Sequence, residues 1–362
     1  MIETVKMTDA ATLSRFDAII DVRSPSEFAE DHLPGAINLP VLSDAERAEV
    51  GAIYKQVSRF TARRVGAAHI ARNVAHHLET ALADKTGKFM PLLYCWRGGM
   101  RSNAMATILS QIGWRIGVLE GGYKTWRRSV VAAMRDSTAP LPVMLLDGQT
   151  GTAKSEILRA AQAKGVQVLD LEDFARHRGS VFGSFADDPQ PDQKLFESRL
   201  YDALSRFDLW RPILVEAESN RIGDCEVPRC LWLAMQDAPR IVLEAPPEIR
   251  AAYLVDAYQD IIANTGAVVD AINRLKSFHS KERIAEWRAM AAARDWRPLA
   301  ADLMRVHYDP LYERSRERGR CGAPIVRFSL DRLDGATFQR VAEEIASALM
   351  SLKQKEPVHD GA

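Results

Sequence analysis

The sequence lacks most of the features that would place a chain outside the ordinary globular proteins. It has four cysteines in 362 residues, too few and too scattered for a disulfide framework. The first sixteen residues contain no apolar signal-peptide core, and no apolar run approaches the roughly 20 residues that a membrane helix needs. Internal repeats and low-complexity tracts are also missing. The sequence therefore predicts a cytoplasmic protein with no membrane partner.

Net charge is absent as well. Lys+Arg and Asp+Glu number 48 each, so no overall field would attract a polyanion, and any nucleic acid would have to be held by local basic patches. The composition, 47% hydrophobic and 27% charged, is typical of a globular protein. A chain of this length is expected to form about two domains.

Three of the cysteines carry no motif. Cys225 and Cys230 lack a second Cys/His pair at zinc spacing, so we expect no metal site there. For these two and for Cys321, the favoured interpretation is a buried or incidental thiol.

The order of apolar runs predicts an α/β protein whose domains each have a central, mainly parallel sheet. Expected strands cover residues 18–22, 36–40, 91–94, 116–119, 143–146, 166–169, 212–216, 240–243 and 325–328. Expected helices cover residues 45–83, 102–112, 124–134, 154–164 and 337–352. A small-polar and proline-containing stretch predicts a linker at 136–142. The predicted domains are therefore 1–135 and 143–352, the second with a helical extension at about 247–320, followed by a flexible tail at 353–362.

The fourth cysteine lies in the segment Cys95 to Ser102, here called the Cys95 loop, between an expected strand and an expected helix. Free amides at a helix start favour an anion, and Gly98 and Gly99 let successive N–H groups turn inward. The guanidiniums of Arg97 and Arg101 add positive charge. These features predict a cysteine with a lowered pKa that acts as a nucleophile. A buried cysteine at a strand end is the plainer alternative.

Four segments in the expected order resemble the rhodanese superfamily. They are Asp21 to Phe28, His32 to Asn38, the Cys95 loop and Glu120 to Trp126. The resemblance implies a rhodanese-type fold in which the loop cysteine carries sulfur as a persulfide.

The Cys95 loop departs from that pattern in its length. Five residues separate Cys95 from Arg101, one more than in the usual sulfurtransferase loop. This spacing resembles that of C-x5-R phosphatases and arsenate reductases. A wider ring of N–H groups suits a tetrahedral oxyanion, so a phosphate-like substrate is expected at Cys95.

A second glycine-rich segment, Gly148 to Ser155 (the glycine loop), follows the linker and an expected strand. It matches the P-loop pattern G-x-x-x-x-G-K-[ST] except that Ala153 replaces the second glycine. We expect alanine to cost little there because the position lies at the helix start. Backbone amides and Lys154 would bind phosphate oxygens, and Ser155 could ligate Mg²⁺. The resulting phosphate-binding set is Gly148, Thr150, Gly151, Thr152, Lys154 and Ser155. Alternatively, the loop has a structural role alone. Whether it uses a nucleotide or Mg²⁺ stays open.

Glu216 and Glu218 after the next strand are candidates for a Walker-B acid.

A rhodanese-type module followed by a P-loop NTPase-like module is similar to the tRNA 2-selenouridine synthase family. The Cys95 loop, the glycine loop and the segment Leu171 to Gly183 carry this resemblance. It adds His177, Arg178 and Ser180 as possible substrate or tRNA contacts.

The resemblance implies a tRNA-modifying transferase that converts wobble 2-thiouridine to 2-selenouridine. The family is expected to S-geranylate the nucleoside with geranyl diphosphate and then to transfer selenium from selenophosphate, with no tightly bound cofactor. We hypothesise that the glycine loop, with Lys154 and Arg178, holds the diphosphate. Cys95, assisted by Arg97, Arg101, Gly98, Gly99 and Ser102, would then accept selenium as a selenyl-sulfide.

RNA would need a basic surface, and the sequence offers three. They are Arg59, Arg63, Arg64 and Arg72; Arg274, Lys276, Lys281, Arg283 and Arg288; and Arg314, Arg316, Arg318 and Arg320. Each is equally compatible with a solvated helix face. Trp287, Trp296 and Tyr308 could stack an unpaired base, although such aromatics more often belong to a core.

Two other functions remain open at this point. One is a sulfurtransferase, or a C-x5-R phosphatase or arsenate reductase, fused to a kinase-like domain. The other is a non-catalytic persulfide carrier with a nucleotide-sensing module. Turnover of an aryl phosphate would favour a phosphatase, and co-purification of tRNA would favour an RNA-modifying enzyme.

Overall fold

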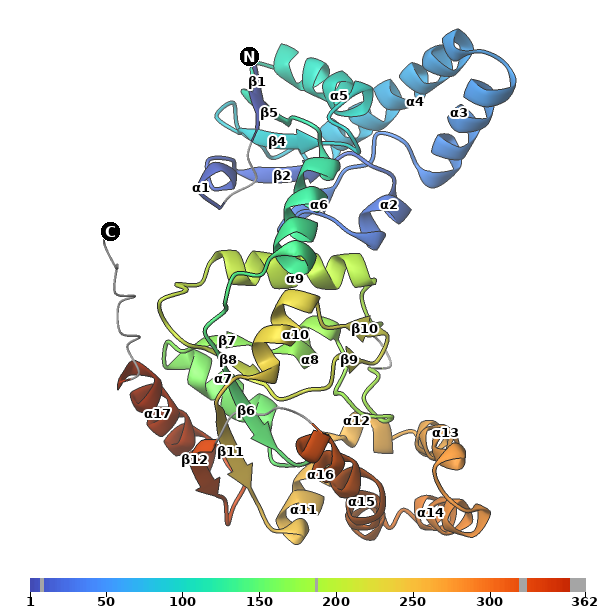
Figure 1. The fold of residues 1–362 in the computed structure, drawn as a ribbon. Coiled ribbons are helices and arrows are strands. Elements are labelled where there is room, and N and C mark those ends of the chain that lie inside the picture. Colours follow the sequence, from blue (N-terminus) through green and yellow to red (C-terminus); the bar gives the residue numbers. More distant parts are fainter. Residues whose placement is uncertain (7–9, 186–187, 319–323, 352–362) are drawn as a thin grey trace. The chain divides into compact units, whose positions relative to one another are not determined.

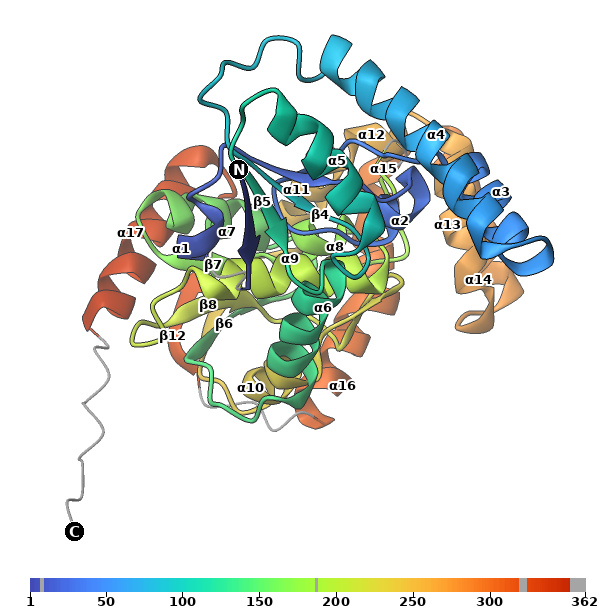
Figure 2. The ribbon, with the colours of Figure 1, turned by 90° about the horizontal axis from the view of Figure 1, so that it is seen from above.

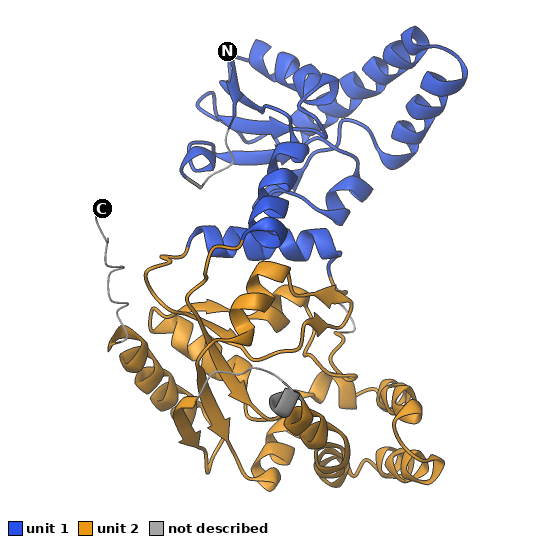
Figure 3. Ribbon diagram, viewed as in Figure 1, with its two compact units in different colours: residues 1–137, 191–206 blue, residues 138–190, 207–362 orange. Residues whose placement is uncertain are grey.

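The computed structural model describes residues 1–6, 10–185, 188–318 and 324–351, and it divides into two compact units (Figures 1 and 3). Unit 1 comprises residues 1–137 and 191–206, and unit 2 comprises residues 138–190 and 207–362. Each unit is built around a five-stranded parallel sheet, which confirms the predicted α/β class.

The sheet of unit 1 has the strand order β1-β5-β4-β2-β3, and every described pairing is parallel. Its strands are β1 (Ile2–Val5), β2 (Ala18–Asp21), β3 (Ala36–Asn38), β4 (Pro91–Tyr94) and β5 (Ile116–Leu119). All four residues of the central strand β4 are buried, as its continuous apolar run predicts. The prediction missed β1, a short edge strand with three exposed residues.

The helices of unit 1 flank this sheet, and two of them form a long hairpin. They are α1 (Ala10–Leu13), α2 (Pro25–Glu30), α3 (Asp44–Gln56), α4 (Arg59–Glu79), α5 (Met100–Gln111) and α6 (Tyr123–Val131), the last continued by a π-helical turn (Ala132–Asp136). The helix expected at 45–83 is two helices, because Ser58 caps a new N-terminus by accepting a hydrogen bond from the Thr61 amide. Figures 1 and 2 both show α3 and α4 side by side, extending from the sheet of unit 1.

The sheet of unit 2 has the strand order β12-β11-β6-β8-β7, again parallel. Its strands are β6 (Val143–Gly148), β7 (Gln167–Leu169), β8 (Ile213–Glu216), β11 (Arg240–Glu244) and β12 (Pro324–Ser329), and a separate two-stranded ribbon pairs β9 (Arg221–Ile222) with β10 (Cys225–Glu226). The central strand β6 is buried along its whole length and ends at the glycine loop.

The helices of unit 2 comprise a set packed on the sheet and a long helical segment. The first set is α7 (Lys154–Ala163), α8 (Leu171–Ala175), α10 (Arg229–Gln236) and α17 (Gly335–Ser351). The second is α11 (Pro247–Ala257), α12 (Gln259–Ile262), α13 (Thr265–Arg274), a 3₁₀ turn (Leu275–Ser277), α14 (Lys281–Ala293), α15 (Trp296–Leu303), a π-helical turn (Met304–Tyr308) and α16 (Asp309–Arg318). The second set has its own core, which includes Ile272, Ile284 and Trp287.

One helix differs from the predicted domain boundaries. The sequence assigns 143–352 to a single domain, but α9 (Gln193–Ser205) packs within unit 1. Trp126 Nε1 donates to Ser198 Oγ at 3.1 Å, and Arg135 Nη2 contacts Glu197 at 2.7 Å. Glu197 is almost fully buried, and Arg127 of α6 pairs with its carboxylate as well, so two arginines of unit 1 balance its charge. The predicted tail at 353–362 lies outside the described residues.

Candidate functional site

The Cys95 loop connects the central strand β4 to α5 and encloses its own sulfur atom. Cys95 is only 4% exposed. Its Sγ accepts hydrogen bonds from the Gly99 amide at 3.2 Å and the Ser102 hydroxyl at 3.3 Å. The first turn of α5 therefore directs donors at the sulfur atom.

The electrostatic balance at this sulfur favours the thiolate. Burial alone raises the pKa of Cys95, because it disfavours the charged form. The Ser102 hydroxyl and the amides of Ser102, Gly99 and Arg97 outweigh burial, so that the pKa of Cys95 lies below its ordinary value. A lowered pKa increases the thiolate fraction of Cys95 relative to an ordinary cysteine, which is the change that a nucleophilic role requires.

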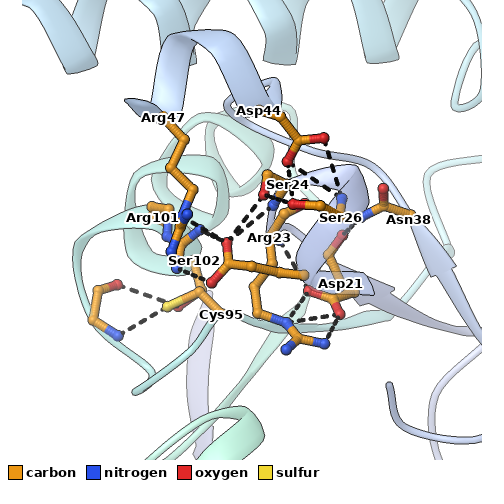
Figure 4. A network of polar contacts seen from close by, with 12 residues as sticks. Asp21, Arg23, Ser24, Ser26, Asn38, Asp44, Arg47, Cys95, Arg101 and Ser102 are labelled. Carbon is orange, nitrogen blue, oxygen red and sulfur yellow. Dashed lines mark hydrogen bonds and ion pairs between the residues drawn. The ribbon is translucent and has the colours of Figure 1, made fainter. Parts of the chain in front are cut away.

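Arg101, one of the two guanidiniums expected beside this thiolate, has a carboxylate partner. The Arg101 side chain pairs with the carboxylate of Glu27, at 2.7 Å (Figure 4). The Arg97 side chain is exposed, and of this residue only the backbone amide contributes to the pKa of Cys95. The inward-facing amides that the sequence predicted are therefore present, and the Ser102 hydroxyl adds a further donor.

Glu27 holds Arg101 at the edge of the Cys95 loop. Its carboxylate also contacts Arg47 Nε at 3.1 Å and accepts from the Ser24 backbone amide and hydroxyl, each at 3.3 Å. Burial raises the pKa of Glu27, but the hydrogen bond and charge of Arg101, together with Arg47, lower it overall. Glu27 belongs to a segment that carried the rhodanese resemblance, although nothing in the sequence pairs it with Arg101.

The Glu120 to Trp126 segment, another carrier of that resemblance, lies directly against the Cys95 loop. The Tyr123 amide donates to the Cys95 carbonyl oxygen at 2.8 Å, and the Lys124 amide donates to that of Trp96 at 3.2 Å. Gly122 has φ 59°, and a Cβ there would lie 2.1 Å from the Cys95 carbonyl oxygen. Only glycine fits this contact, so the second segment sets the shape of the first.

The glycine loop connects β6 to α7 in unit 2. Lys154 Nζ donates to the Gly148 carbonyl oxygen at 2.9 Å, and Thr152 Oγ1 donates to that of Gln149 at 2.8 Å. Ser155 Oγ contacts Glu172 at 3.3 Å. The lysine therefore lies over the loop, where it can also contact an anion held by the amides.

Ala153 occupies a less favourable backbone conformation than the sequence suggested. Its φ of 59° and ψ of 35° are left-handed, and it precedes the first helical residue. The expectation that alanine costs little is wrong, because a Cβ disfavours this region and glycine does not. The P-loop pattern has glycine at this position for the same reason.

A cavity of about 520 Å³ brings together two groups of predicted residues. The glycine loop lines it from Thr150 to Ser155, and the segment after α8 contributes His177, Arg178 and Ser180. Gly148 lies at the end of β6 and does not line it. In the sequence, only the family resemblance connected the glycine loop with the segment after α8. In the fold, residues of both line the same cavity.

Arg178 is the best-placed cation in this cavity after Lys154. Its guanidinium lies over the rings of Phe185 and Tyr258, 4.3 and 4.8 Å from their centroids, and contacts Asp260 at 3.0 Å. Its buried Nη1 has no partner among the described residues. A fixed guanidinium with a spare donor suits a phosphate oxygen.

Two partly buried carboxyl groups also line the cavity. Glu172 and Glu218 both line the cavity, and both face Gly179, where a Cβ would lie 2.7 and 2.9 Å from their oxygens. Burial and the negative charge of Glu218 raise the pKa of Glu172 to about 8, although Lys154 opposes this. Glu216 does not line the cavity but is fully enclosed, and burial raises its pKa too. A raised pKa favours the neutral form of Glu172, which makes this side of the cavity less repulsive to an anion.

A narrow apolar pocket of about 80 Å³ shares part of its wall with this cavity. Both spaces are lined by Thr150, Ser180, Leu254, Tyr258 and Tyr308. The remaining lining is apolar and comes mainly from the helical segment: Phe182, Val255, Ile261, Ile262, Val268, Trp296, Leu299, Ala300, Leu303 and Met304. Sequence reasoning missed this wall, because the helical segment lies about a hundred residues from the glycine loop and shows no motif.

The aromatic residues considered for base stacking are placed differently from one another. Trp287 is fully buried and donates to Asp302 at 2.8 Å, so it belongs to the core and cannot stack on a base. Trp296 and Tyr308 line the apolar pocket.

The basic groups also differ. Arg59, Arg63, Arg64 and Arg72 are all exposed on α4. In the second group, Arg283 pairs with Asp302 at 3.0 Å and Arg288 contacts Asn273, while Arg274, Lys276 and Lys281 are exposed. In the third, Arg314 is exposed, and the side chains of Arg316, Arg318 and Arg320 lie outside the described part of the chain.

The structure bears on three further expectations, which concern the other cysteines, a metal site and a membrane helix. Cys225 and Cys230 are buried, as predicted, whereas Cys321 lies outside the described residues. Within the described ranges, no three His, Cys, Asp or Glu side chains converge so that they could hold a metal ion. None of the helices described is both long and apolar enough to span a membrane.

Two family models match the chain, one in each half. Residues 5–129 match the rhodanese-like domain, and residues 141–285 match a domain described as the tRNA 2-selenouridine synthase AAA domain. The first match contains the Cys95 loop and the second contains the glycine loop.

Curated relatives match across both halves and carry the name tRNA 2-selenouridine synthase. The protein of Shewanella denitrificans is 35% identical over 73% of this chain and 68% of its own length. That of Chromohalobacter salexigens is 36% identical over 68% of this chain and 66% of its own length. That of Cupriavidus necator is 38% identical over 67% of this chain and 65% of its own length. The chain thus spans about two thirds of the length of these relatives.

Proposed function

The chain belongs to the tRNA 2-selenouridine synthase family, and from this membership we propose that it is a tRNA-modifying transferase that replaces the sulfur of wobble 2-thiouridine with selenium. The proposal has two half-reactions, one in each unit. Geranyl diphosphate and selenophosphate are the proposed donors.

The first half-reaction is S-geranylation in unit 2. One observation carries it: the glycine loop lines a cavity that shares part of its wall with an apolar pocket. Such a pair of spaces suits a molecule with a diphosphate at one end and an apolar chain at the other, of which the pocket of about 80 Å³ takes the first few carbons. Lys154 and Arg178 would bind the diphosphate, and Tyr258 and Leu254 would contact the start of the chain.

The bonds of this step follow from that placement. The 2-thio sulfur attacks the allylic carbon, the carbon–oxygen bond breaks, and diphosphate leaves with its added negative charge. Lys154 and Arg178 stabilise that charge as it develops. The uridine loses its N3 proton, so no oxidant, reductant or hydrolysis is needed.

The second half-reaction takes place at Cys95 in unit 1. A selenyl-sulfide formed directly from selenophosphate would require a two-electron oxidant, because selenium in that donor is already fully reduced. Attack of the Cys95 thiolate on phosphorus avoids this requirement. The phosphorus–selenium bond breaks, and selenide leaves as the nucleophile that displaces the geranyl thiolate from C2 of the uridine. Water then hydrolyses the phosphocysteine. The amides of Gly99 and Ser102 would hold the tetrahedral anion.

Reconstitution with defined components tests the function. The full chain is incubated with an RNA hairpin containing 2-thiouridine, geranyl diphosphate and selenophosphate, and the nucleosides are analysed by mass spectrometry. We expect the geranylated nucleoside with geranyl diphosphate alone, and 2-selenouridine plus geranyl thiol when both donors are present. Selenium incorporation without geranyl diphosphate would contradict the pathway. Turnover of an aryl phosphate without RNA conversion would instead favour a phosphatase.

A further inference from the structure

The hairpin of α3 and α4 in unit 1 reaches the Cys95 loop only at its base, where Arg47 contacts Glu27, and its distal part has no role in either proposed half-reaction. No residue of α3 is buried, and α4 buries only Ala62, Gly66, Val74 and His77. The helices approach closely at Gly66, where a Cβ would lie 3.5 Å from the Val50 side chain. The hairpin therefore packs mainly on itself, and its distal end presents a large surface to solvent (Figures 1 and 2).

The distal end of the hairpin comprises residues 54–64 and is here called the hairpin tip. It exposes three apolar or aromatic side chains to solvent. Tyr54, Val57 and Phe60 are 49%, 69% and 76% exposed. The guanidinium of Arg59 lies 5.6 Å from the centroid of the Tyr54 ring. Solvent-exposed aromatic rings next to an arginine are characteristic of surfaces that stack on a planar group of a partner, such as a nucleic-acid base.

The charges of the hairpin are segregated along its length. Residues 50–78 contain no Asp or Glu but five Lys and Arg: Lys55, Arg59, Arg63, Arg64 and Arg72. The acids lie at the base, where Glu46 and Glu49 contact His69 at 2.9 and 3.0 Å. In a chain with no net charge, this leaves a local positive field at the tip.

We propose that the hairpin tip is the docking surface for the RNA substrate, in which Arg59, Arg63 and Arg64 bind phosphates and Phe60 stacks on an unpaired base. This proposal rests on the proposed function, which requires RNA but does not say where it binds. A tip that is positive and aromatic complements a polyanion with exposed bases. A second copy of the chain fits less well, because a two-fold contact would bring like charges together.

Binding of short RNAs to the full chain tests this surface. The probes are an RNA hairpin with an unpaired loop and a fully paired duplex of the same length, each titrated at several salt concentrations. The test variant is Arg59→Ala/Arg63→Ala/Arg64→Ala. The matched control is Lys88→Ala/Arg115→Ala/Arg128→Ala, which removes the same charge from other exposed positions of unit 1.

We expect the tip variant to weaken binding of both probes by about tenfold or more. The slope of log affinity against log salt should fall by about 2, at roughly 0.7–0.9 per phosphate contact. Phe60→Ala should weaken binding of the RNA hairpin by about fivefold or more and leave the duplex unchanged. In the modification reaction, KM for RNA should rise while kcat is retained. The control variant should resemble the wild type.

Other outcomes separate this proposal from the function on which it rests. If the tip variants bind RNA with unchanged affinity and salt slope while the wild type converts the nucleoside, the docking surface is wrong and the function stands. A change in oligomeric state or in binding to anionic vesicles, with RNA affinity unchanged, would likewise overturn it. A wild-type chain that binds no RNA overturns both proposals.

Discussion

The Cys95 loop and the glycine loop each connect the central strand of a five-stranded parallel sheet to the first turn of a helix. They differ in what lies beside the start of that helix. In the Cys95 loop the Gly99 amide and the Ser102 hydroxyl are directed at a buried sulfur. In the glycine loop the same region borders a cavity of about 520 Å³. One loop therefore directs its donors at an atom of the protein, and the other leaves room beside it for the external anion of the proposed function.

The two loops also differ in how charge is balanced nearby. Beside Cys95, the Glu27 carboxylate is paired with Arg101 and Arg47, which lowers its pKa. Beside the glycine loop, burial raises the pKa of both Glu172 and Glu218, and the negative charge of Glu218 raises that of Glu172 further. A closed site with paired charges suits a nucleophile. An open site with neutralised acids suits the entry of a phosphate.

Removal of Lys154 should give the largest effect. Lys154→Ala is expected to lower kcat/KM for S-geranylation by about 100-fold, because a positioned cation no longer stabilises the departing diphosphate. Lys164→Ala, at the end of the same helix, is the matched control and should retain normal activity. A Lys154→Ala chain that geranylates normally would show that the glycine loop does not bind the diphosphate.

The Cys95 loop is probed by Ser102→Ala. Loss of the hydroxyl donor should raise the pKa of Cys95 and slow its alkylation by iodoacetamide at neutral pH by about tenfold, since a hydrogen bond to a charged group contributes roughly 1.5–3 kcal/mol. The measurement is the alkylation rate across a pH series. Ser110→Ala, in the last turns of the same helix, should leave the rate unchanged. An identical pH profile for Ser102→Ala would mean that the hydroxyl does not stabilise the thiolate.

The acidic wall of the cavity makes a pH-dependent contribution to stability. The pKa of Glu172 in the folded chain is about 8, above its ordinary value of 4.5. Between these values the unfolded chain loses this proton while the folded chain keeps it, so stability falls as pH rises. Glu172→Gln should therefore melt increasingly above the wild type between pH 5 and 8, with the Tm gap widening by about 2 °C or more. Glu343→Gln, an exposed carboxyl in the same unit, should show no such trend. A gap that stays constant over this range would refute the raised pKa.

The smallest effect is expected at Ala153. Because its φ is 59°, Ala153→Gly should stabilise the fold by about 1 kcal/mol in denaturant unfolding. The same change at Ala163, the last residue of helix α7, should not stabilise the fold, because the backbone there is right-handed helical. Destabilisation by Ala153→Gly would indicate that the left-handed conformation is not strained.

Both loops could be located from the sequence because their chemistry lies in consecutive residues. Buried strands that run directly into glycine-rich turns identify Cys95 and Lys154, and the parallel sheets follow from the same pattern. The fold class was predictable for that reason. The break between α3 and α4 at Ser58 was missed, since a single cap interrupts an otherwise continuous helical pattern.

Contacts between distant segments could not be predicted. Arg101 was assigned to the sulfur because it is close in sequence, but Glu27, far away in the chain, binds it instead. Tyr258 and Leu254 reach the cavity only because α11 packs beside the glycine loop. Helix α9 packs in unit 1 although the chain on both sides of it belongs to unit 2. Such outcomes depend on tertiary packing rather than on local pattern.

Supplying each variant with RNA that is already geranylated separates the two loops most directly. With selenophosphate present, Lys154→Ala should convert this RNA to 2-selenouridine, and Cys95→Ala should leave it unchanged. With 2-thiouridine RNA and geranyl diphosphate, Cys95→Ala should form the geranylated nucleoside and Lys154→Ala should not. Loss of geranylation in Cys95→Ala, or failure of Lys154→Ala on geranylated RNA, would contradict the assignment of one half-reaction to each unit.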